Sequence, residues 1–518
     1  MSKWIERMIH FLTSRMALVA LAIILQVIWI VMLLTQLIQN SVFYEILFNL
    51  VGLILVVYIV QSKGNPAYKL SWTILIFGVP ILGGLLYLIF GREIIQHHYY
   101  QRTMKMRNLT LERLKDSQSS SRERQLEAQK KYEGISNELH YIWNYAGHPA
   151  YENTKSRYFP EGEAYFESLF EDLKNARKFI FLEYFIVNKG YIWSTLYDIL
   201  LQKVEEGVEV RFLYDDVGCI QLLPRKFDRI VSAKGIQCRK FNAFIPIMSA
   251  VMNNRNHQKV VVIDGRIGYT GGINLADEYA NRITRFGHWK DCGIRLEGPG
   301  VENLTAIFLS MWNLTGMMTE EDLSYAFPPI VPCPSEEGIV VPYGDSPLDG
   351  EQVGESVYLN FITRAEKTLY IMTPYLIVDN ETMTALCLAA KRGVDVRICM
   401  PHIPDKKLIF MLSRSYYGQL MEAGVRIFEY MPGFLHSKCF LRDNRTAVVG
   451  TINLDYRSLY LHFECGVFLH KARAVEELAE DFTDTFAKSM EITEDFLHSL
   501  PFYVKILQSF MRIFAPLF

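Results

Sequence analysis

The sequence predicts an α/β catalytic region made of two copies of one unit, preceded by N-terminal segments that are apolar enough to cross a membrane. Three observations lead to this fold class. Apolar residues concentrate before about residue 90, strand-length apolar runs then alternate with helical stretches, and the same order of segments occurs twice. The two parts are therefore expected to meet different surroundings, lipid for the first and water for the second.

The N-terminal region contains three candidate transmembrane segments, at residues 16–37, 43–60 and 70–90. The first and third carry no charged side chain, whereas the second contains Glu45 and Asn49 and is the weakest of the three. We therefore expect residues 1–95 to form an anchor of two or three spans in the cell membrane. Basic residues are most numerous after the third segment, between Arg92 and Arg107, which favours a cytoplasmic position for the catalytic region.

Composition also predicts the remaining boundaries. Residues 96–150 are expected to form a polar linker, in part a solvated helix, because residues 108–134 combine mixed charge with a serine run. The two copies of the α/β unit are expected at residues 151–330 and 331–498. The tail at residues 499–518 is apolar but interrupted by polar residues, which predicts an amphipathic helix that lies on a membrane or packs on the core.

The duplication is visible in three pairs of segments. The run ARKFIFLEYFIV at residues 176–187 matches AEKTLYIMTPYLIV at residues 365–378. GVEVRFLY, which begins at Gly207, matches GVDVRICM, which begins at Gly393, and DCGIRL from Asp291 matches ECGVFL from Glu464. Chance similarity would not keep these segments in the same order, so we expect two related α/β units.

Each copy also contains the polar motif H-x-K-x₄-D-x₆-G-x-x-N. Its members in the first copy are His257, Lys259, Asp264, Gly271 and Asn274, and in the second copy His436, Lys438, Asp443, Gly450 and Asn453. One His-x-Lys pair would be a weak signal. Two copies with identical spacing inside a duplicated unit are a strong one.

The motif has the residue types that a phosphodiester site needs. In a strand, residues two apart point to the same face, so each histidine projects together with its lysine. Lys259 and Lys438 can neutralise the non-bridging phosphate oxygens, and Asn274 and Asn453 can donate hydrogen bonds to them, so no metal or other cofactor is required. One histidine can attack phosphorus while the other protonates the leaving oxygen, and the spacing alone does not say which does which.

Four carboxylates accompany the motifs. A nucleophilic imidazole needs a carboxylate that accepts a hydrogen bond from its other nitrogen, and we propose Asp291 and Glu464 as the pair that orients the histidines. Asp264 and Asp443 are counted with the catalytic motif, although we expect them to fix a turn rather than to contact substrate.

Other polar residues are given no catalytic role. Six further histidines are read as isolated side chains: His97, His98, His140, His148, His462 and His470. Tyr456 and Arg457 are left open between pocket wall and substrate contact. The eight cysteines occur singly, without the spacing of a zinc site, and are expected to be free thiols.

The paired HxKxxxxD motifs with GxxN tails resemble the phospholipase D superfamily. Longer stretches, among them GGINLADEY, WKDCGIRLEGPGV and NLDYRSLYLHFE, are similar to the bacterial cardiolipin synthases of that superfamily. The resemblance implies a phospholipase D-like pseudo-dimer whose motifs meet at the interface of the two halves. It also implies transfer between two phosphatidylglycerol molecules, giving cardiolipin and glycerol through a covalent phosphohistidine. By the same analogy His257 is the nucleophile and His436 the general acid and then base.

Three other classes of protein are weighed against this one. A hydrolytic phospholipase D, or another phosphatidyltransferase, would share every catalytic residue, and only the acceptor would differ. A membrane-tethered nuclease would need a basic groove, which a net charge of −2 does not indicate, so no nucleic-acid partner is expected. A non-catalytic scaffold would be expected to lack a motif residue, and none is missing. The expected partners are phosphatidylglycerol and membrane lipids, and the sequence does not indicate an oligomeric state.

Overall fold

The computed structural model describes residues 21, 23–28, 30–31, 41–62, 64–91, 122–243, 254–316, 326–328, 332–333 and 336–517, with five single residues between 101 and 114. The chain divides into two compact units. The small unit comprises Met1–Tyr100, Phe244–Asn254 and Ile506–Phe518, and the large unit comprises Gln101–Ala243 and Arg255–Lys505.

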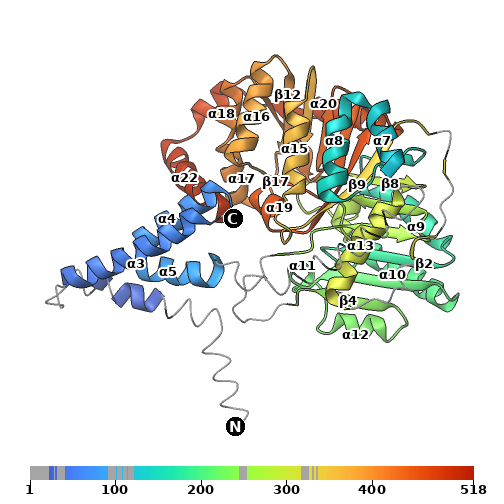
Figure 1. The fold of residues 1–518 in the computed structure, drawn as a ribbon, viewed down its shortest axis with the longest axis horizontal. Coiled ribbons are helices and arrows are strands. Elements are labelled where there is room, and N and C mark those ends of the chain that lie inside the picture. Colours follow the sequence, from blue (N-terminus) through green and yellow to red (C-terminus); the bar gives the residue numbers. More distant parts are fainter. Residues whose placement is uncertain are drawn as a thin grey trace, which may run out of the picture. The chain divides into compact units, whose positions relative to one another are not determined.

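The small unit is helical. Its described elements are α3 (Ser41–Gln61), α4 (Pro66–Gly78), α5 (Pro80–Leu86) and the π-helical turn η1 (Tyr87–Gly91) (Figure 1). Helix α4 begins with Pro66, and the Asn65 side chain caps it by accepting the backbone N–H of Ala67 at 2.9 Å. A small buried cluster joins these helices and contains Ile59, Trp72, Ile76 and Tyr87.

None of the helices among the described residues is both long and apolar enough to cross a membrane. The segments predicted to span, at residues 43–60 and 70–90, fall on α3, α4, α5 and η1, and their crossing is not confirmed. Most of the first predicted segment, residues 16–37, lies outside the described residues.

The described part of the large unit contains two large sheets, which confirm the predicted duplicated α/β fold (Figure 1), and two two-stranded sheets, one of which pairs β11 (Leu376–Ile377) with β17 (Leu454–Asp455). In the first half the strands are β1 (Lys155–Phe159), β2 (Phe179–Tyr184), β3 (Glu209–Asp215), β4 (Gln237–Phe241), β5 (Val260–Ile263), β6 (Ile267–Gly271) and β8 (Gly293–Glu297). In the second half they are β9 (Ile339–Asp345), β10 (Thr368–Met372), β12 (Asp395–Pro401), β13 (Arg426–Tyr430), β15 (Cys439–Arg442), β16 (Thr446–Gly450), β18 (Glu464–His470) and β19 (Ser489–Glu491).

The two sheets have the same topology. The first sheet has the order β1-β8-β6-β5-β2-β3-β4, and the second has the order β9-β18-β16-β15-β10-β12-β13, with β19 added at its end. In both, the motif strand (β5 or β15) is antiparallel to the central strand (β2 or β10). The two motif histidines therefore occupy equivalent positions, just before β5 and just before β15.

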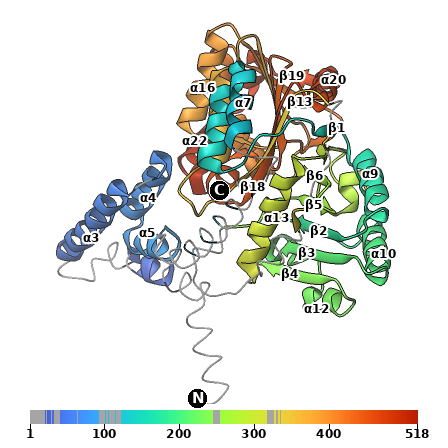
Figure 2. The same ribbon diagram turned by 45° about the vertical axis from the view of Figure 1, so that its right-hand side comes forward.

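Helices cover both faces of the first sheet, and Figure 2 shows α9 and α10 on one side and α13 on the other. Alternation along β2 explains this: Ile180 and Leu182 pack in the core with α9 and α10, whereas Phe181 faces α13 and stacks on Phe308 at 4.9 Å. The helices of the first half are α9 (Gly162–Lys174), α10 (Tyr191–Glu205), α11 (Asp216–Cys219), α12 (Phe227–Ser232), η7 (Asp277–Ala280) and α13 (Val301–Thr315).

The second half is built alike and shares a core with the first. Its helices are α15 (Val353–Thr363), α16 (Asn380–Lys391), α17 (Lys407–Arg414), α18 (Tyr417–Glu422), α19 (Tyr456–Tyr460), α20 (Arg473–Ala487) and α21 (Glu494–Ser499). Helix α13 reaches β9 and helix α20 reaches β1, so one apolar core runs through both halves. The chain then continues into α22 (Phe502–Ile513) and η8 (Ala515–Leu517).

The segment expected as a polar linker is partly folded onto the large unit. It contains α7 (Arg122–Lys131), η4 (Glu133–Ile135), α8 (Ser136–Tyr141) and η5 (Ile142–Ala146). Glu138 is buried and pairs with Arg442 at 3.0 Å, and the Gln125 side chain exchanges two hydrogen bonds with the backbone of Ala150. These buried polar contacts order a stretch whose composition alone indicates a solvated chain.

Candidate active site

Two short parallel pairings join the halves and carry the site. Strand β7 (His288–Lys290) of the first half pairs with β14 (Gly433–Leu435) of the second, and an isolated bridge pairs Asn256 with Phe463. The backbone N–H of His436 donates to the carbonyl of Lys290 at 2.6 Å, and that of His257 donates to the carbonyl of Phe463 at 3.0 Å. Each motif histidine is thereby held beside a carboxylate of the other half, because Asp291 follows Lys290 and Glu464 follows Phe463 in the chain.

The histidine–carboxylate pairs cross between the halves. Nδ1 of His257 lies 2.8 and 3.0 Å from the two carboxylate oxygens of Glu464, and Nδ1 of His436 lies 2.6 Å from Oδ2 of Asp291. Both histidines are nearly buried, at 7% and 8% exposure, and both carboxylates are fully buried. A carboxylate on Nδ1 fixes the tautomer and leaves Nε2 as the reactive nitrogen.

The motif glycines allow the strands to approach closely enough for this geometry. A Cβ at Gly271 would lie 2.4 Å from the carbonyl oxygen of Cys292, and a Cβ at Gly450 would lie 2.4 Å from that of Cys465. These cysteines follow Asp291 and Glu464 directly in the chain. Larger residues at either glycine would therefore push away the strand that carries the orienting carboxylate.

Both motif lysines are buried beside their histidines. The ammonium groups of Lys259 and Lys438 each donate to the backbone carbonyl of the histidine two residues earlier. Burial lowers the pKa of Lys259 to about 7, against the opposing charge of Glu464, and burial also lowers the pKa of Lys438. A phosphate bound between them would restore their cationic form, since an opposite charge favours protonation.

The free site holds both histidines neutral. Burial, followed by the charges of Lys259 and Lys438, holds the pKa of His257 well below its usual value. Burial and then Lys438 lower the pKa of His436 to about 4, against the opposing effect of Asp291. A neutral imidazole has a free lone pair, which is the form that a nucleophile requires.

The two motif asparagines have different surroundings. Asn453 is buried, and in the described part of the chain its Oδ1 has no hydrogen-bond partner. Asn274 accepts the N–H of Ile186 at 2.9 Å and donates to the hydroxyl of Tyr279 at 2.8 Å, whose ring lies 5.7 Å from that of His436. Asn274 therefore supports the wall around His436 and keeps one N–H for a ligand.

The motif aspartates lie at the far ends of their strands, away from the histidines. The carboxylate of Asp264 accepts the backbone N–H groups of residues 177–179, and that of Asp443 accepts those of residues 366–368. Both have positive φ, 53° and 52°, as turn residues do. Asp264 and Asp443 thus fasten β5 to β2 and β15 to β10, and their lack of substrate contact stays a prediction.

One histidine that was read as isolated lies in the site. The ring of His462 is 5.6 Å from that of His257, and its Nδ1 is 3.8 Å from Oε1 of Glu464. The signal in the sequence is its spacing, because it stands two residues before Glu464 and so shares a strand face with it. The equivalent residue of the first half, two before Asp291, is Trp289, whose ring lies 5.6 Å from that of His436.

The other residues without an assigned role are placed as follows. His148 and His470 are buried and hydrogen-bonded, to the N–H of Gly344 at 3.0 Å and to Thr446 at 2.8 Å, so they are structural rather than isolated. His140 is exposed, and His97 and His98 lie outside the described residues. Tyr456 is buried against Tyr460, whereas Arg457 is exposed. All eight cysteines are free.

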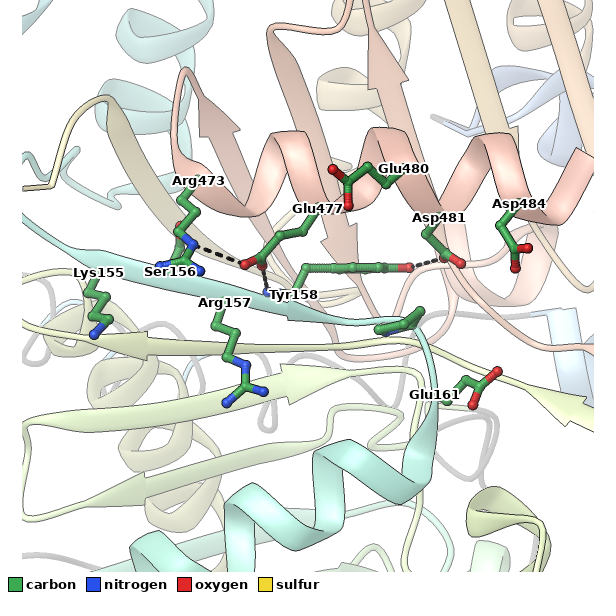
Figure 3. A pocket seen from close by; sticks show the side chains of 11 residues that line it. Lys155, Ser156, Arg157, Tyr158, Glu161, Arg473, Glu477, Glu480, Asp481 and Asp484 are labelled. Atoms are coloured by element: carbon green, nitrogen blue, oxygen red, sulfur yellow. Dashed lines mark hydrogen bonds and ion pairs between the residues drawn. The ribbon is translucent and has the colours of Figure 1, made fainter.

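A cavity of about 620 Å³ lies elsewhere, between β1 and α20 (Figure 3). Its wall contains five carboxylates and only three basic side chains, so it does not suit a phosphodiester. Asp481 in this wall accepts the hydroxyl of Tyr158 at 2.7 Å and pairs with Lys290 at 2.7 Å. Because the carbonyl of Lys290 holds the N–H of His436, this cavity wall braces the strand beneath the site.

Known proteins share both the sequence and the fold. A family model described as cardiolipin synthase, PLD-like domain, matches residues 169–312 and 358–486, and one described as phospholipase D-nuclease N-terminal matches residues 47–92. An uncharacterized protein of Streptococcus mutans is 41% identical over 89% of this chain and 99% of its own. The cardiolipin synthase of Geobacillus kaustophilus is 34% identical over 92% of this chain and 93% of its own. The crystal structure of phosphatidylserine synthase from Haemophilus influenzae, 16% identical, has a TM-score of 0.52 over 70% of this chain and 94% of its own, which is a likeness of fold.

Proposed function

Because the chain belongs to the family of cardiolipin synthases with phospholipase D-like domains, we propose that its crossed histidine pairs carry out that synthesis through a phosphohistidine. The enzyme is a phosphatidyltransferase: it joins two phosphatidylglycerol molecules and releases glycerol. The observation that carries the proposal is the pairing of each buried histidine with the other half's carboxylate, which leaves two Nε2 atoms for one phosphodiester.

The first step forms the covalent intermediate. Nε2 of His257 attacks phosphorus, and the bond from phosphorus to the glycerol oxygen breaks. The departing oxygen takes a proton from His436 and leaves as glycerol. Lys259 and Lys438 neutralise the non-bridging oxygens, and the remaining amide N–H groups of Asn274 and Asn453 donate to them.

The second step reverses these roles with a new alcohol. The terminal hydroxyl of a second phosphatidylglycerol attacks the phosphohistidine, while His436 takes the hydroxyl proton. The bond between phosphorus and His257 then breaks, and cardiolipin is released. His436 must be protonated in the first step, and the negative charge of the bound phosphodiester favours this form, which the empty site disfavours.

The small unit is proposed to hold the enzyme at the cell membrane. Helix α3 exposes a run of large apolar side chains: Phe43, Ile46, Leu47, Leu50, Val51, Leu53, Ile54, Val57, Tyr58 and Val60. Such a surface is costly in water and favourable in lipid. With the basic residues that follow at 92–107, the large unit would face the cytoplasm. A cysteine introduced at the exposed Lys130 should then resist an impermeant thiol reagent in intact cells and react after lysis.

Product analysis tests the proposed chemistry. Purified enzyme given phosphatidylglycerol alone should release glycerol and cardiolipin in equal amounts, and added glycerol should drive the reaction backwards. The buried pairs support this outcome, because water must be kept from the phosphohistidine. Phosphatidic acid as the main product would instead identify a hydrolytic phospholipase D with water as the acceptor.

A further inference from the structure

A third imidazole stands beside the His257–Glu464 pair. Oε1 of Glu464 lies 2.8 Å from Nδ1 of His257 and 3.8 Å from Nδ1 of His462. One ligand atom from each of the three residues lies within 4.8 Å of the others. The carboxylate oxygen is therefore shared between two imidazoles that face it from different strands.

His462 has no use in the arrangement described so far. Its side chain is 11% exposed, and in the described part of the chain neither ring nitrogen has a hydrogen-bond partner. The separation of 3.8 Å from Glu464 is too long for a hydrogen bond. Buried polar groups are nearly always hydrogen-bonded, so the two ring nitrogens of His462, which face Glu464 without a hydrogen bond, are available to a ligand.

Two imidazoles and one carboxylate are a ligand set of zinc enzymes. Imidazole favours Zn²⁺, Co²⁺, Ni²⁺ and Cu²⁺ over the oxygen-seeking Mg²⁺ and Ca²⁺. We propose that His257, His462 and Glu464 form a chelating site for a zinc-like transition-metal ion, and that capture of the ion stops phosphatidyl transfer. The ion acts as an inhibitor, and turnover itself proceeds without it.

Inhibition follows from the tautomer of His257 and rests on its role as nucleophile in the proposed function. In the metal-free enzyme, Nδ1 of His257 carries the proton that faces Glu464. A metal bound at Nδ1 needs the lone pair there, so the proton moves to Nε2 and no net proton is lost. Nε2–H has no lone pair for phosphorus, and Glu464 is bound to the metal as well.

The second pair cannot form the same site. The residue equivalent to His462 is Trp289, and an indole offers no lone pair to a metal. The ammonium groups of Lys259 and Lys438 oppose a nearby cation, so we expect binding that chelators reverse. One ion at the first pair and none at the second is the expected arrangement.

Cobalt spectroscopy and inhibition assays test the proposal on the full chain in detergent. Chelator-treated enzyme should be fully active, and Co²⁺ should give a visible absorption band that Zn²⁺ displaces. Zn²⁺ should inhibit turnover and Mg²⁺ should not. His462→Phe keeps a ring but removes the ligand. The rate of each variant in the presence of metal is compared with the metal-free rate of the same variant. His288→Ala is the matched control, because His288 lies in the other histidine–carboxylate group of the described residues, with Glu161 and Glu163.

We expect His462→Phe to lose the cobalt band and to need at least about tenfold more Zn²⁺ for half inhibition, a difference of about 1.4 kcal/mol. His288→Ala should behave as the wild type. Equal zinc inhibition of wild type and His462→Phe overturns the proposal, as does a wild type without a cobalt band. Melting curves show whether the variant folds, and His462→Asn, which should behave like His462→Phe, serves if it does not. The cobalt band does not depend on turnover, so a phosphohistidine found on His436 would overturn the mechanism without affecting the metal site.

Discussion

The His436–Asp291 pair and the His257–Glu464 pair occupy equivalent positions in the two halves, yet their surroundings differ. Three aromatic rings enclose His436, with centroids 5.6 to 5.7 Å from its own: Tyr279, Trp289 and Phe434. Among the residues that the structure describes, the ring of His257 has one aromatic neighbour, Phe185 at 4.9 Å, and lies beside the imidazole of His462. One histidine therefore lies in an aromatic enclosure and the other in a polar one.

The central strands extend this contrast. Glu183 on β2 pairs with Val260, and Met372 on β10 occupies the equivalent place, opposite Cys439. Glu183 is fully buried, and burial raises its pKa to about 8. The duplicated backbone thus fixes two like histidine–carboxylate pairs, while unlike side chains around them give each pair its own electrostatics. The aromatic rings keep water away from His436, whose protonation then depends on the charge of the bound phosphodiester.

Removal of either histidine is expected to have the largest effect. His257→Ala and His436→Ala should each lower kcat by at least about three powers of ten, because nucleophile and acid act as a unit. Enzyme mixed with phosphatidylglycerol that is radiolabelled at phosphorus, and denatured in alkaline detergent to preserve phosphohistidine, should carry label on His257, found by peptide mapping. His140→Ala, an exposed position, is the control. Label on His436 would exchange the two roles.

Variants of the two orienting carboxylates should respond differently when the leaving group of the substrate is changed. Glu464→Gln and Asp291→Asn keep the shape but lose the charge, and each should lower kcat by about 10² to 10⁴ with phosphatidylglycerol. A phosphatidyl ester of nitrophenol needs no general acid in the first step, so release of nitrophenol in the first turnover should be largely restored in Asp291→Asn and little restored in Glu464→Gln. Equal restoration in both variants would contradict separate roles for the pairs.

Sequence reasoning reached the duplicated fold because period-two apolar runs and repeated segments depend on local chain chemistry. It also named the residues that the structure brings together: His257 with Glu464 and His436 with Asp291. The crossing of these pairs was out of reach, since it depends on the pairing of β7 with β14 across the halves.

The errors also have physical reasons. His462 was read as isolated because exposure was assumed, whereas the bridge between Asn256 and Phe463 buries it beside the site. The hydrogen bond from Asn274 to Tyr279 in η7 could not be predicted either. Partners of this kind depend on tertiary contacts that spacing does not contain.

The buried carboxylate of the first half should make stability depend on pH. The pKa of Glu183 is raised to about 8 in the folded chain. The contribution of Glu183 to folding stability is therefore full below the ordinary pKa of a glutamate and is lost as pH rises toward 8. Glu183→Gln does not titrate. The free energy of unfolding of Glu183→Gln, relative to that of wild type, should therefore rise by on the order of 3 kcal/mol between pH 5 and pH 8. Its melting temperature relative to wild type should rise over the same range. Met372→Leu, at the equivalent site, should show no such trend, and an equal trend would contradict the assignment.

The motif aspartates should show where the two halves are alike. Asp264 and Asp443 each hold three backbone N–H groups at the start of the central strand, so Asp264→Asn and Asp443→Asn should each cost about 1 to 2 kcal/mol of stability. Because neither carboxylate lies at the histidines, kcat of the folded variants should stay within a few-fold of wild type. Melting temperature and kcat measured on the same preparations separate these effects. A large fall in kcat at an unchanged melting temperature, in either variant, would show that this aspartate takes part in catalysis and that the two turns are not equivalent.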